Sequence, residues 1–135
     1  MFNINVRVRA LMNPKLEALE VGSTVRDAVK KMVEREIGCV VITKDGAPIG
    51  IITERDILRR LVFRGETLDK PVEELMSGPL ITVGPLATLG EAADLMVQKK
   101  IRRLLIKDGE KIVGIITQRD LQKALMETFN ALLLT

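Results

Sequence analysis

The sequence lacks several of the side chains on which protein chemistry most often depends. Its 135 residues include no histidine, tryptophan or tyrosine, three phenylalanines and a single cysteine. Acid–base catalysis by histidine and an intrachain disulfide are therefore excluded. The usual ligands of a structural zinc site are missing as well, and no serine or cysteine stands beside a base. We expect no metal site and no catalytic residue.

Charge and long apolar runs are also in short supply. The 21 Lys and Arg residues exceed the 18 Asp and Glu residues by only three, with both signs mixed along the chain, which disfavours a polyanionic partner. No apolar run approaches the roughly 20 residues that span a bilayer. The first seven residues alternate apolar and polar side chains, unlike a signal peptide. We therefore expect a cytoplasmic protein with no membrane association, whose 47% hydrophobic residues fill one domain or two small ones.

What the chain does contain is a repeat with a period of 64 residues. The Leu-Met pair at residues 11 and 12 recurs at residues 75 and 76. The segment Gly50–Asp56 recurs as Gly114–Asp120 with six of seven residues identical. A fixed period predicts two copies of one supersecondary unit. Because a unit this small rarely supplies an adequate core alone, we expect the copies to pack about a pseudo-twofold axis.

Each copy is predicted to contain elements in the order β, α, β, β, α. Thr24 and Thr88 are N-cap candidates with an acidic residue three positions on, and apolar residues follow at helical spacing. Short β-rich runs around Asp-Gly then predict a hairpin in each copy. The ranges are helices from 25 and 89, hairpins 39–43 with 48–53 and 104–107 with 111–117, second helices 54–63 and 118–134, and extended pieces near 16–19 and 80–83. This order predicts an α/β fold of the α+β kind.

A Thr at a strand end and an Asp three residues later recur where each second helix begins, as Thr53 with Asp56 and Thr117 with Asp120. Helix capping alone explains such a pair in isolation. The same junction also offers N–H groups to an anion, a hydroxyl donor, and a carboxylate that can accept both hydrogen bonds of a cis-diol. Those groups suit a ribose phosphate. Cations that can add phosphate charge, or that are simply solvated, are Arg55, Arg102, Arg103 and Arg119.

With these motifs the chain resembles a tandem pair of cystathionine-β-synthase-type domains, the CBS pair or Bateman module. The resemblance rests on the Leu-Met pair, the capped helix, the Asp-Gly hairpin and the closing Gly-Ile-Ile-Thr-x-Arg-Asp, each present twice, and covers about residues 8 to 126. It implies a stand-alone pair of β-α-β-β-α CBS motifs about a pseudo-twofold axis. We place the motifs at residues 1–66 and 67–135.

The resemblance further implies a regulatory module that is not an enzyme and requires no cofactor. It would sense an adenosyl ligand, AMP, ADP, ATP or S-adenosylmethionine, in clefts between the two motifs. In that family the Asp of the closing motif holds the ribose hydroxyls and the Thr lies by the phosphate, which assigns Asp56 with Thr53 to one cleft and Asp120 with Thr117 to the other. The base would be held by Leu80, Ile81 and Ile101 in the Asp56 cleft, and by Leu16 and Ile37 in the Asp120 cleft.

The two clefts are not expected to bind alike. Arg102 and Arg103 precede the second strand of the second copy, where the first copy has Gly38 and Cys39. We expect the Asp56 cleft, lined by these arginines, to favour more phosphates, and the Asp120 cleft to bind more weakly or not at all.

Two other functions stay open at this point. A protein-interaction or dimerisation module with vestigial clefts is favoured by leucines and a phenylalanine at helical spacing in residues 121–133, although a core contact explains the same spacing. Nucleic-acid binding is disfavoured by the small net charge and the missing Tyr and Trp. For the ligand-sensing module we expect a homodimer, and a regulated partner protein that the sequence does not name.

Overall fold

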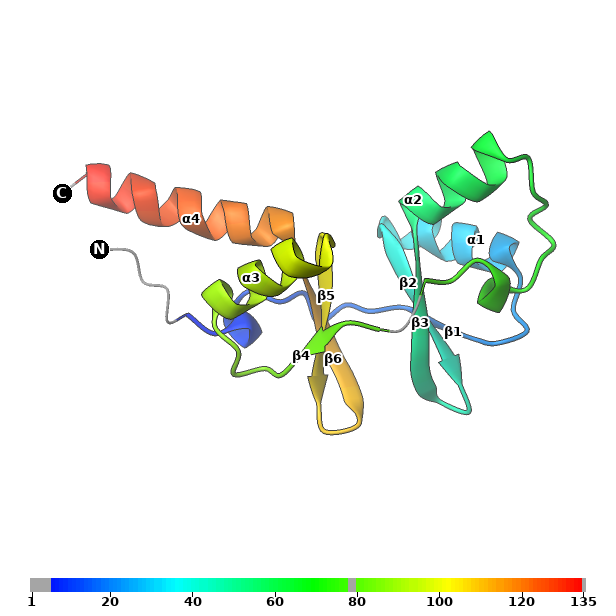
Figure 1. Ribbon diagram of the computed structural model, residues 1–135, viewed down its shortest axis with the longest axis horizontal. Helices are drawn as coiled ribbons and strands as arrows, with labels where there is room; N and C mark the ends of the chain where they lie inside the picture. The colour runs from blue at the N-terminus through cyan, green and yellow to red at the C-terminus, as the bar shows by residue number, and fades with distance from the viewer. Residues whose placement is uncertain (1–5, 78–79, 135) are drawn as a thin grey trace. The chain divides into compact units, whose positions relative to one another are not determined.

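The computed structural model describes residues 6–77 and 80–134 and divides the chain into two compact units. The first unit is Leu16–Leu80, and the second combines Ile81–Thr135 with Met1–Lys15 (Figure 1). The Leu-Met pair that begins each copy of the repeat therefore belongs to the unit built from the other copy. The predicted motif limits, 1–66 and 67–135, follow the repeat and stay a prediction.

The first unit is built on a three-stranded sheet. β1 (Ala18–Glu20) runs parallel to β2 (Cys39–Lys44), and β2 pairs antiparallel with β3 (Ala47–Thr53). The helix α1 (Val25–Arg35) supplies the crossover that a parallel pair of strands requires. A further helix, α2 (Glu54–Ile57), follows β3 on the same side of the sheet as α1 (Figure 1).

The second unit repeats this arrangement. β4 (Thr82–Val83) runs parallel to β5 (Arg103–Asp108), which pairs antiparallel with β6 (Lys111–Thr117), and α3 (Leu89–Lys99) connects β4 to β5. The predicted order β, α, β, β, α is therefore confirmed in both copies, with mixed α and β structure throughout.

The two hairpins differ at their tips. Asp45 and Gly46 form the first turn with φ angles of 51° and 80°, the left-handed pair whose twist suits a two-residue hairpin. In the second hairpin Asp108 still pairs with Lys111, so Gly109, with a φ of 62°, opens the turn. The Asp-Gly signal thus predicts both hairpins. In the second hairpin, however, the Asp is the last paired strand residue and the turn begins at the Gly.

The first helix of each unit begins after a capping threonine. The Thr24 hydroxyl oxygen accepts the backbone N–H of Asp27 at 3.2 Å, and the Asp27 carboxylate accepts the N–H of Thr24 at 2.9 Å. Thr88 accepts the N–H of Glu91 at 3.1 Å. Each helix ends after 11 residues at a residue in the left-handed conformation. The predicted starts of both helices are confirmed.

The second helices differ in their hydrogen bonding. α2 (Glu54–Ile57) passes into a π-helical segment, η2 (Leu58–Phe63), at whose end the N–H of Arg64 donates to the carbonyl of Arg59 at 3.2 Å. This five-residue step is the mark of a π-helix. α4 (Gln118–Leu133) is α-helical throughout. Helix is therefore confirmed over both predicted ranges, while the π-helical segment was not predicted.

Each unit has its own hydrophobic core, formed by the first helix, the sheet and a short 3₁₀ turn that precedes the Leu-Met pair. The turns are η3 (Val72–Glu74) in the first unit and η1 (Val8–Ala10) in the second. The buried residues of the first core are Val25, Ala28, Met32, Val40, Ile42, Ile52, Val72 and Leu75. Those of the second are Val8, Ala92, Met96, Leu104, Ile106 and Ile116.

Within residues 6–77 and 80–134, every helix is too short or too polar to cross a membrane.

The residues after the 3₁₀ turns complete the sheets. Ser77 forms an antiparallel bridge with Ile51 of β3, its N–H donating to the Ile51 carbonyl at 2.9 Å. Asn13 forms the equivalent bridge with Ile115 of β6, with its N–H donating at 2.8 Å. These bridges bring residues 77 and 13 to the strands that lead into the second helices.

Candidate functional site

The first junction, at the end of β3 and the start of α2, is held by a closed capping box. Oδ2 of Asp56 accepts the backbone N–H of Thr53 at 2.9 Å and the Thr53 hydroxyl at 3.0 Å. The Thr53 hydroxyl oxygen accepts the N–H of Asp56 at 3.3 Å. The remaining carboxylate oxygen, Oδ1, accepts the Ser77 hydroxyl at 3.3 Å. Both oxygens of Asp56 are therefore engaged within the first unit.

The second junction, at the end of β6 and the start of α4, contains the same box. Oδ2 of Asp120 accepts the N–H of Thr117 at 2.8 Å and its hydroxyl at 3.0 Å, and Oγ1 of Thr117 accepts the Asp120 N–H at 3.2 Å. Among the described residues nothing donates to Oδ1 of Asp120. Within the part of the chain that the structure describes, one oxygen of this carboxylate is therefore open to a ligand.

The first turn of each second helix is hydrogen-bonded to the residue just before the preceding hairpin. The N–H of Glu54 donates to the carbonyl of Gly38 at 3.0 Å, and that of Gln118 donates to the carbonyl of Arg102 at 2.8 Å. The next N–H groups, those of Arg55 and Arg119, have no acceptor among the described residues. They are the donors that a helix N-terminus offers to an anion.

The arginines that the sequence singles out have no partner side chain in the described part of the chain. Within the described part of the chain, the guanidinium groups of Arg55, Arg102, Arg103 and Arg119 form neither a hydrogen bond nor an ion pair. Arg103 is the strand partner of Thr117, so the arginine pair adjoins the second junction within its own unit. The corresponding residue of the first unit, Cys39, is the strand partner of Thr53. Assignment of the arginine pair to the Asp56 cleft stays a prediction.

The predicted base-contacting residues are distributed over both units. Ile37 packs against the first core, whereas Ile81 and Ile101 pack against the second. Leu16 and Leu80 are half-buried and lie at the two ends of the first unit. Each predicted cleft therefore draws on residues of both units, and its assembly stays a prediction.

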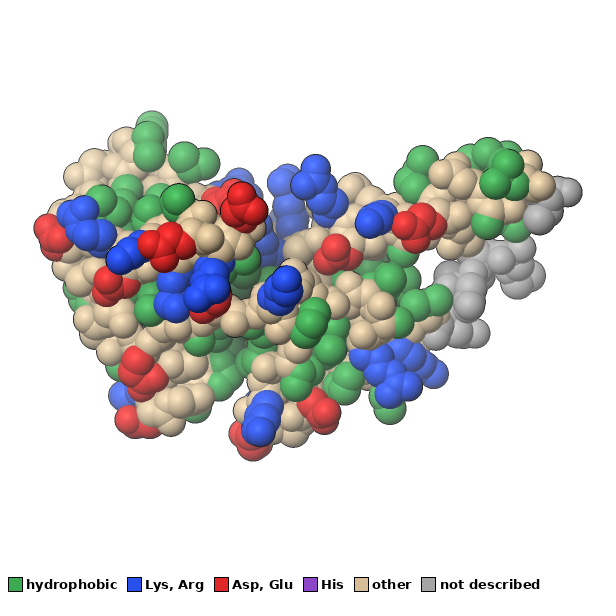
Figure 2. Space-filling view, turned by 180° about the vertical axis from the view of Figure 1, so that it is seen from behind, with side chains coloured by type: hydrophobic (Ala, Val, Ile, Leu, Met, Phe, Trp, Pro, Cys, Tyr) green, Lys and Arg blue, Asp and Glu red, His purple; other side chains and the backbone are tan. Residues whose placement is uncertain are grey.

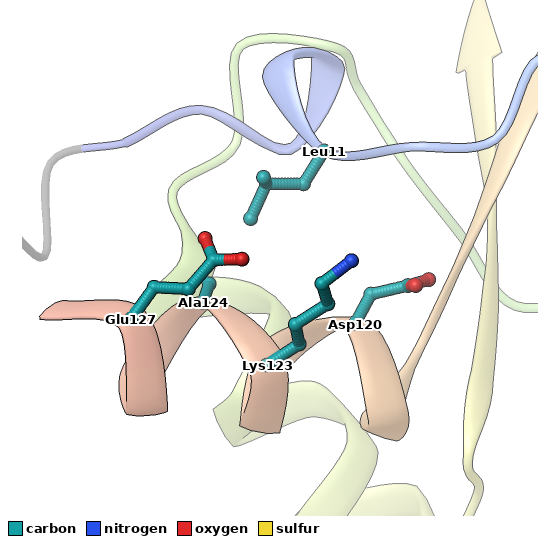
Figure 3. Close-up of a pocket in the computed structure, with 5 residues that line it drawn as sticks. All are labelled: Leu11, Asp120, Lys123, Ala124 and Glu127. Carbon is teal, nitrogen blue, oxygen red and sulfur yellow. The ribbon is translucent and has the colours of Figure 1, made fainter. Parts of the chain in front are cut away.

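A pocket of about 160 Å³ opens beside the second junction, between α4 and the residue that follows η1. Its lining residues are Leu11, Asp120, Lys123, Ala124 and Glu127. Figure 3 shows the side chains of Lys123 and Glu127 rising from α4 on the side where Leu11 lies, while the carboxylate of Asp120 points away from Leu11. Lys123 and Glu127 are not among the predicted site residues, although their spacing of three and seven residues from Asp120 places them on one helix face. Among the described residues no group of three or more Cys, Asp or Glu side chains can hold a metal ion.

The first unit has an ion-pair network at the equivalent place. Glu66 accepts hydrogen bonds from Arg60 and, at 2.6 Å, from Lys70. Arg60 also donates to the backbone carbonyl of Glu74 at 3.1 Å. The hydrogen bonds from Arg60 and Lys70 lower the pKa of Glu66 to about 2. The network therefore joins η2, η3 and the loop between them.

The sequence model of the CBS domain matches residues 8–63 and again residues 72–127. The chain belongs to the CBS-domain family. The two matched segments confirm the predicted CBS pair, and the described elements confirm its α+β fold. A crystal structure of an uncharacterized conserved protein from Pyrococcus horikoshii superposes with a TM-score of 0.84 at 34% identity, covering 92% of this CBS chain and 95% of that one.

Another similar structure contains a bound ligand. A CBS domain protein from Pyrobaculum aerophilum, complexed with AMP, superposes with a TM-score of 0.80 at 26% identity and covers 93% of this chain and 99% of its own.

An uncharacterized protein of Methanopyrus kandleri is 43% identical over 106 residues, which are 74% of this CBS chain. The chain spans 54% of the length of that relative and 61% of the length of another, from Methanocaldococcus jannaschii.

Proposed function

We propose that this CBS pair is a regulatory module that binds an adenosyl ligand, AMP, ADP, ATP or S-adenosylmethionine, in clefts between its two motifs. The observation that carries the proposal is the hydrogen bonding of the Asp120 carboxylate. Its carboxylate is oriented by the capping box through Oδ2, keeps Oδ1 open, and lies beside the available N–H of Arg119. The relative complexed with AMP, 26% identical over nearly the whole chain, supports the same ligand class.

The proposed roles follow the chemistry of each group. The carboxylates of Asp56 and Asp120 accept hydrogen bonds from the two ribose hydroxyls. The N–H groups of Arg55 and Arg119 meet the phosphate at the helix N-termini. The hydroxyls of Thr53 and Thr117 join them once they turn away from the aspartates. Residues proposed to hold the base or to add phosphate charge are Leu16, Ile37, Leu80, Ile81, Ile101, Arg102 and Arg103.

The proposed role consists of recognition and signalling, with no bond made or broken in the ligand. Carboxylate, hydroxyl, backbone N–H and guanidinium groups are sufficient for it. We propose a cytoplasmic protein without a required cofactor, whose ligand alters its affinity for a regulated partner protein.

Thermal unfolding tests the proposal. The protein is first stripped of any copurified nucleotide and then heated with and without each of the four ligands. A ligand at 100 times its Kd stabilises the folded state by about 2.7 kcal/mol, which raises the Tm of a chain of this size by about 10 °C. The double variant Asp56→Ala with Asp120→Ala should lose the shift.

Asp27→Ala is the matched control, because it breaks the same kind of capping box in α1, away from the proposed site. It should lower the Tm yet keep the ligand-induced shift. If none of the four ligands at millimolar concentration shifts the Tm of the wild-type protein, the proposed function is wrong.

A second candidate function is self-association, either beside ligand binding or in place of it. Large apolar side chains are exposed along α4, among them Leu125, Met126 and Phe129, whose exposed fractions lie between 46% and 56%. Figure 2 shows such hydrophobic side chains gathered on the outer part of α4. We propose that α4 contributes to a homodimer. If the assembly forms in the Asp56 and Asp120 variants and ignores nucleotide, a pure interaction module is the better account.

A further inference from the structure

The 64-residue period allows the two junctions to be compared position by position. In the second unit, the pocket lies between α4 and the residue after η1, with Ala124 on the helix and Leu11 opposite. The equivalent positions of the first unit are occupied by Arg60, 64 residues before Ala124, and by Leu75, 64 residues after Leu11. Leu75 is buried, with 2% of its surface exposed, whereas Leu11 is half-buried.

Arg60 occupies the position of Ala124 in the first unit. Its guanidinium extends from η2 to η3, where it donates to the carbonyl of Glu74 at 3.1 Å, and it is held by Glu66 from the connecting loop. Ala124 has no side chain that could span the same distance. Where the second unit has a pocket beside Ala124, the first unit therefore has an arginine that is held by an ion pair and by a backbone carbonyl.

The two aspartates also differ, because only the carboxylate of Asp56 accepts a hydrogen bond from a neighbouring side chain outside its capping box. Ser77, which bridges to β3, donates its hydroxyl to Oδ1 of Asp56 at 3.3 Å. Its equivalent, Asn13, uses its side-chain oxygen to accept the N–H of Lys15 at 2.9 Å instead. A ribose hydroxyl arriving at Asp56 must share Oδ1 with the Ser77 hydroxyl, whereas at Asp120 no described residue donates to that oxygen.

We infer that the second junction is the primary ligand site and that Ser77, together with the Arg60–Glu66 pair, makes the first junction the weaker one. The inference rests on the proposed function and adds to it which of the two sites fills first. It reverses the order expected from the placement of Arg102 and Arg103 alone. Lys123, in the pocket beside Asp120, supplies a cation on the same helix face.

Isothermal titration calorimetry of the stripped protein with AMP as the probe tests the order. The wild-type protein should bind AMP in a tighter and a weaker step. Asp120→Asn should weaken the tighter step about 10- to 100-fold, the value of one hydrogen bond to a charged group. Asp56→Asn should act on the weaker step. Asp27→Asn, which alters the capping box of α1, should leave both steps unchanged.

Two exchange variants test the cause. Ser77→Ala should tighten the weaker step about two- to tenfold, because the competing hydrogen bond is lost. Ala124→Arg, which installs the residue of the first unit, should weaken the tighter step, and its Tm is measured to confirm that it folds. Loss of the tighter step in Asp56→Asn, or two steps of equal affinity, overturns the inference and leaves the proposed function standing. No heat with AMP or the other adenosyl ligands overturns both.

Discussion

Two glycines at equivalent strand positions, Gly50 and Gly114, allow the Leu-Met pairs to pack. A Cβ atom at Gly50 would lie 2.4 Å from Sδ of Met76, and one at Gly114 would lie 2.5 Å from Sδ of Met12. Each methionine therefore lies directly on the strand backbone. This contact explains why glycine and the Leu-Met pair recur at the same 64-residue spacing.

Substitution of these glycines should destabilise the protein. Gly50→Ala and Gly114→Ala each force a methionine away from the sheet, at a cost of about 1–3 kcal/mol, measured by urea unfolding. Gly90→Ala is the control, because the nearest atom to its Cβ, Oγ1 of Thr88, lies 3.8 Å away, and alanine in a helix is favoured by about 0.5–1 kcal/mol. In a Met76→Ala background the cost of Gly50→Ala should fall. An unchanged cost would show that the methionine is not its cause.

At the scale of elements, the connection after η2 is held by charge. Glu66 pairs with Arg60 on η2 and with Lys70 four residues later in the loop. Its carboxylate is stabilised in the charged form, since its pKa falls from 4.5 to about 2 in the folded chain. The ion pairs therefore stabilise the folded state only while Glu66 is ionised.

This predicts a pH dependence of stability. A depressed folded-state pKa gives stabilisation that is complete above the unfolded pKa, near 4.5, and is lost as the pH falls toward about 2. Glu66→Gln should be less stable than the wild type at pH 7, and the difference should shrink between pH 4.5 and 2. Urea unfolding of both proteins across this range measures it. A difference that stays constant with pH would contradict the assigned ion pairs.

The sequence predicts the contacts between residues that are close in the chain, and it does not predict the contacts between residues that are far apart. The capping boxes of Thr53 and Thr117 span three residues, so spacing alone predicts them. The contact between Ser77 and Asp56 spans 21 residues and depends on the bridge to β3. The contacts of Arg60 with Glu66 and with the carbonyl of Glu74 likewise depend on where the loop between η2 and η3 packs. Such contacts follow from tertiary packing, which spacing does not encode.

At the scale of the whole molecule, the exposed apolar side chains of α4 bear on assembly. Covering them with a second copy would remove apolar surface from water, which is favourable in proportion to its area. The proposed homodimer therefore predicts that charge on this face opposes association.

Leu125→Glu combined with Phe129→Glu should convert a dimer into a monomer, as measured by sedimentation equilibrium. Leu86→Glu is a matched control, because Leu86 is similarly exposed at 58% but lies in a loop between β4 and α3. A double variant that sediments as the wild type does would rule out this face of α4 as the dimer contact.

The central claim, that this CBS pair recognises an adenosyl ligand, is tested most directly by equilibrium dialysis of the stripped wild-type protein against labelled AMP. The account predicts saturable binding that excess unlabelled AMP displaces, with no more than two molecules bound per chain. The result that would contradict it is the absence of saturable binding for AMP and, in parallel cells, for ADP, ATP and S-adenosylmethionine at millimolar concentration.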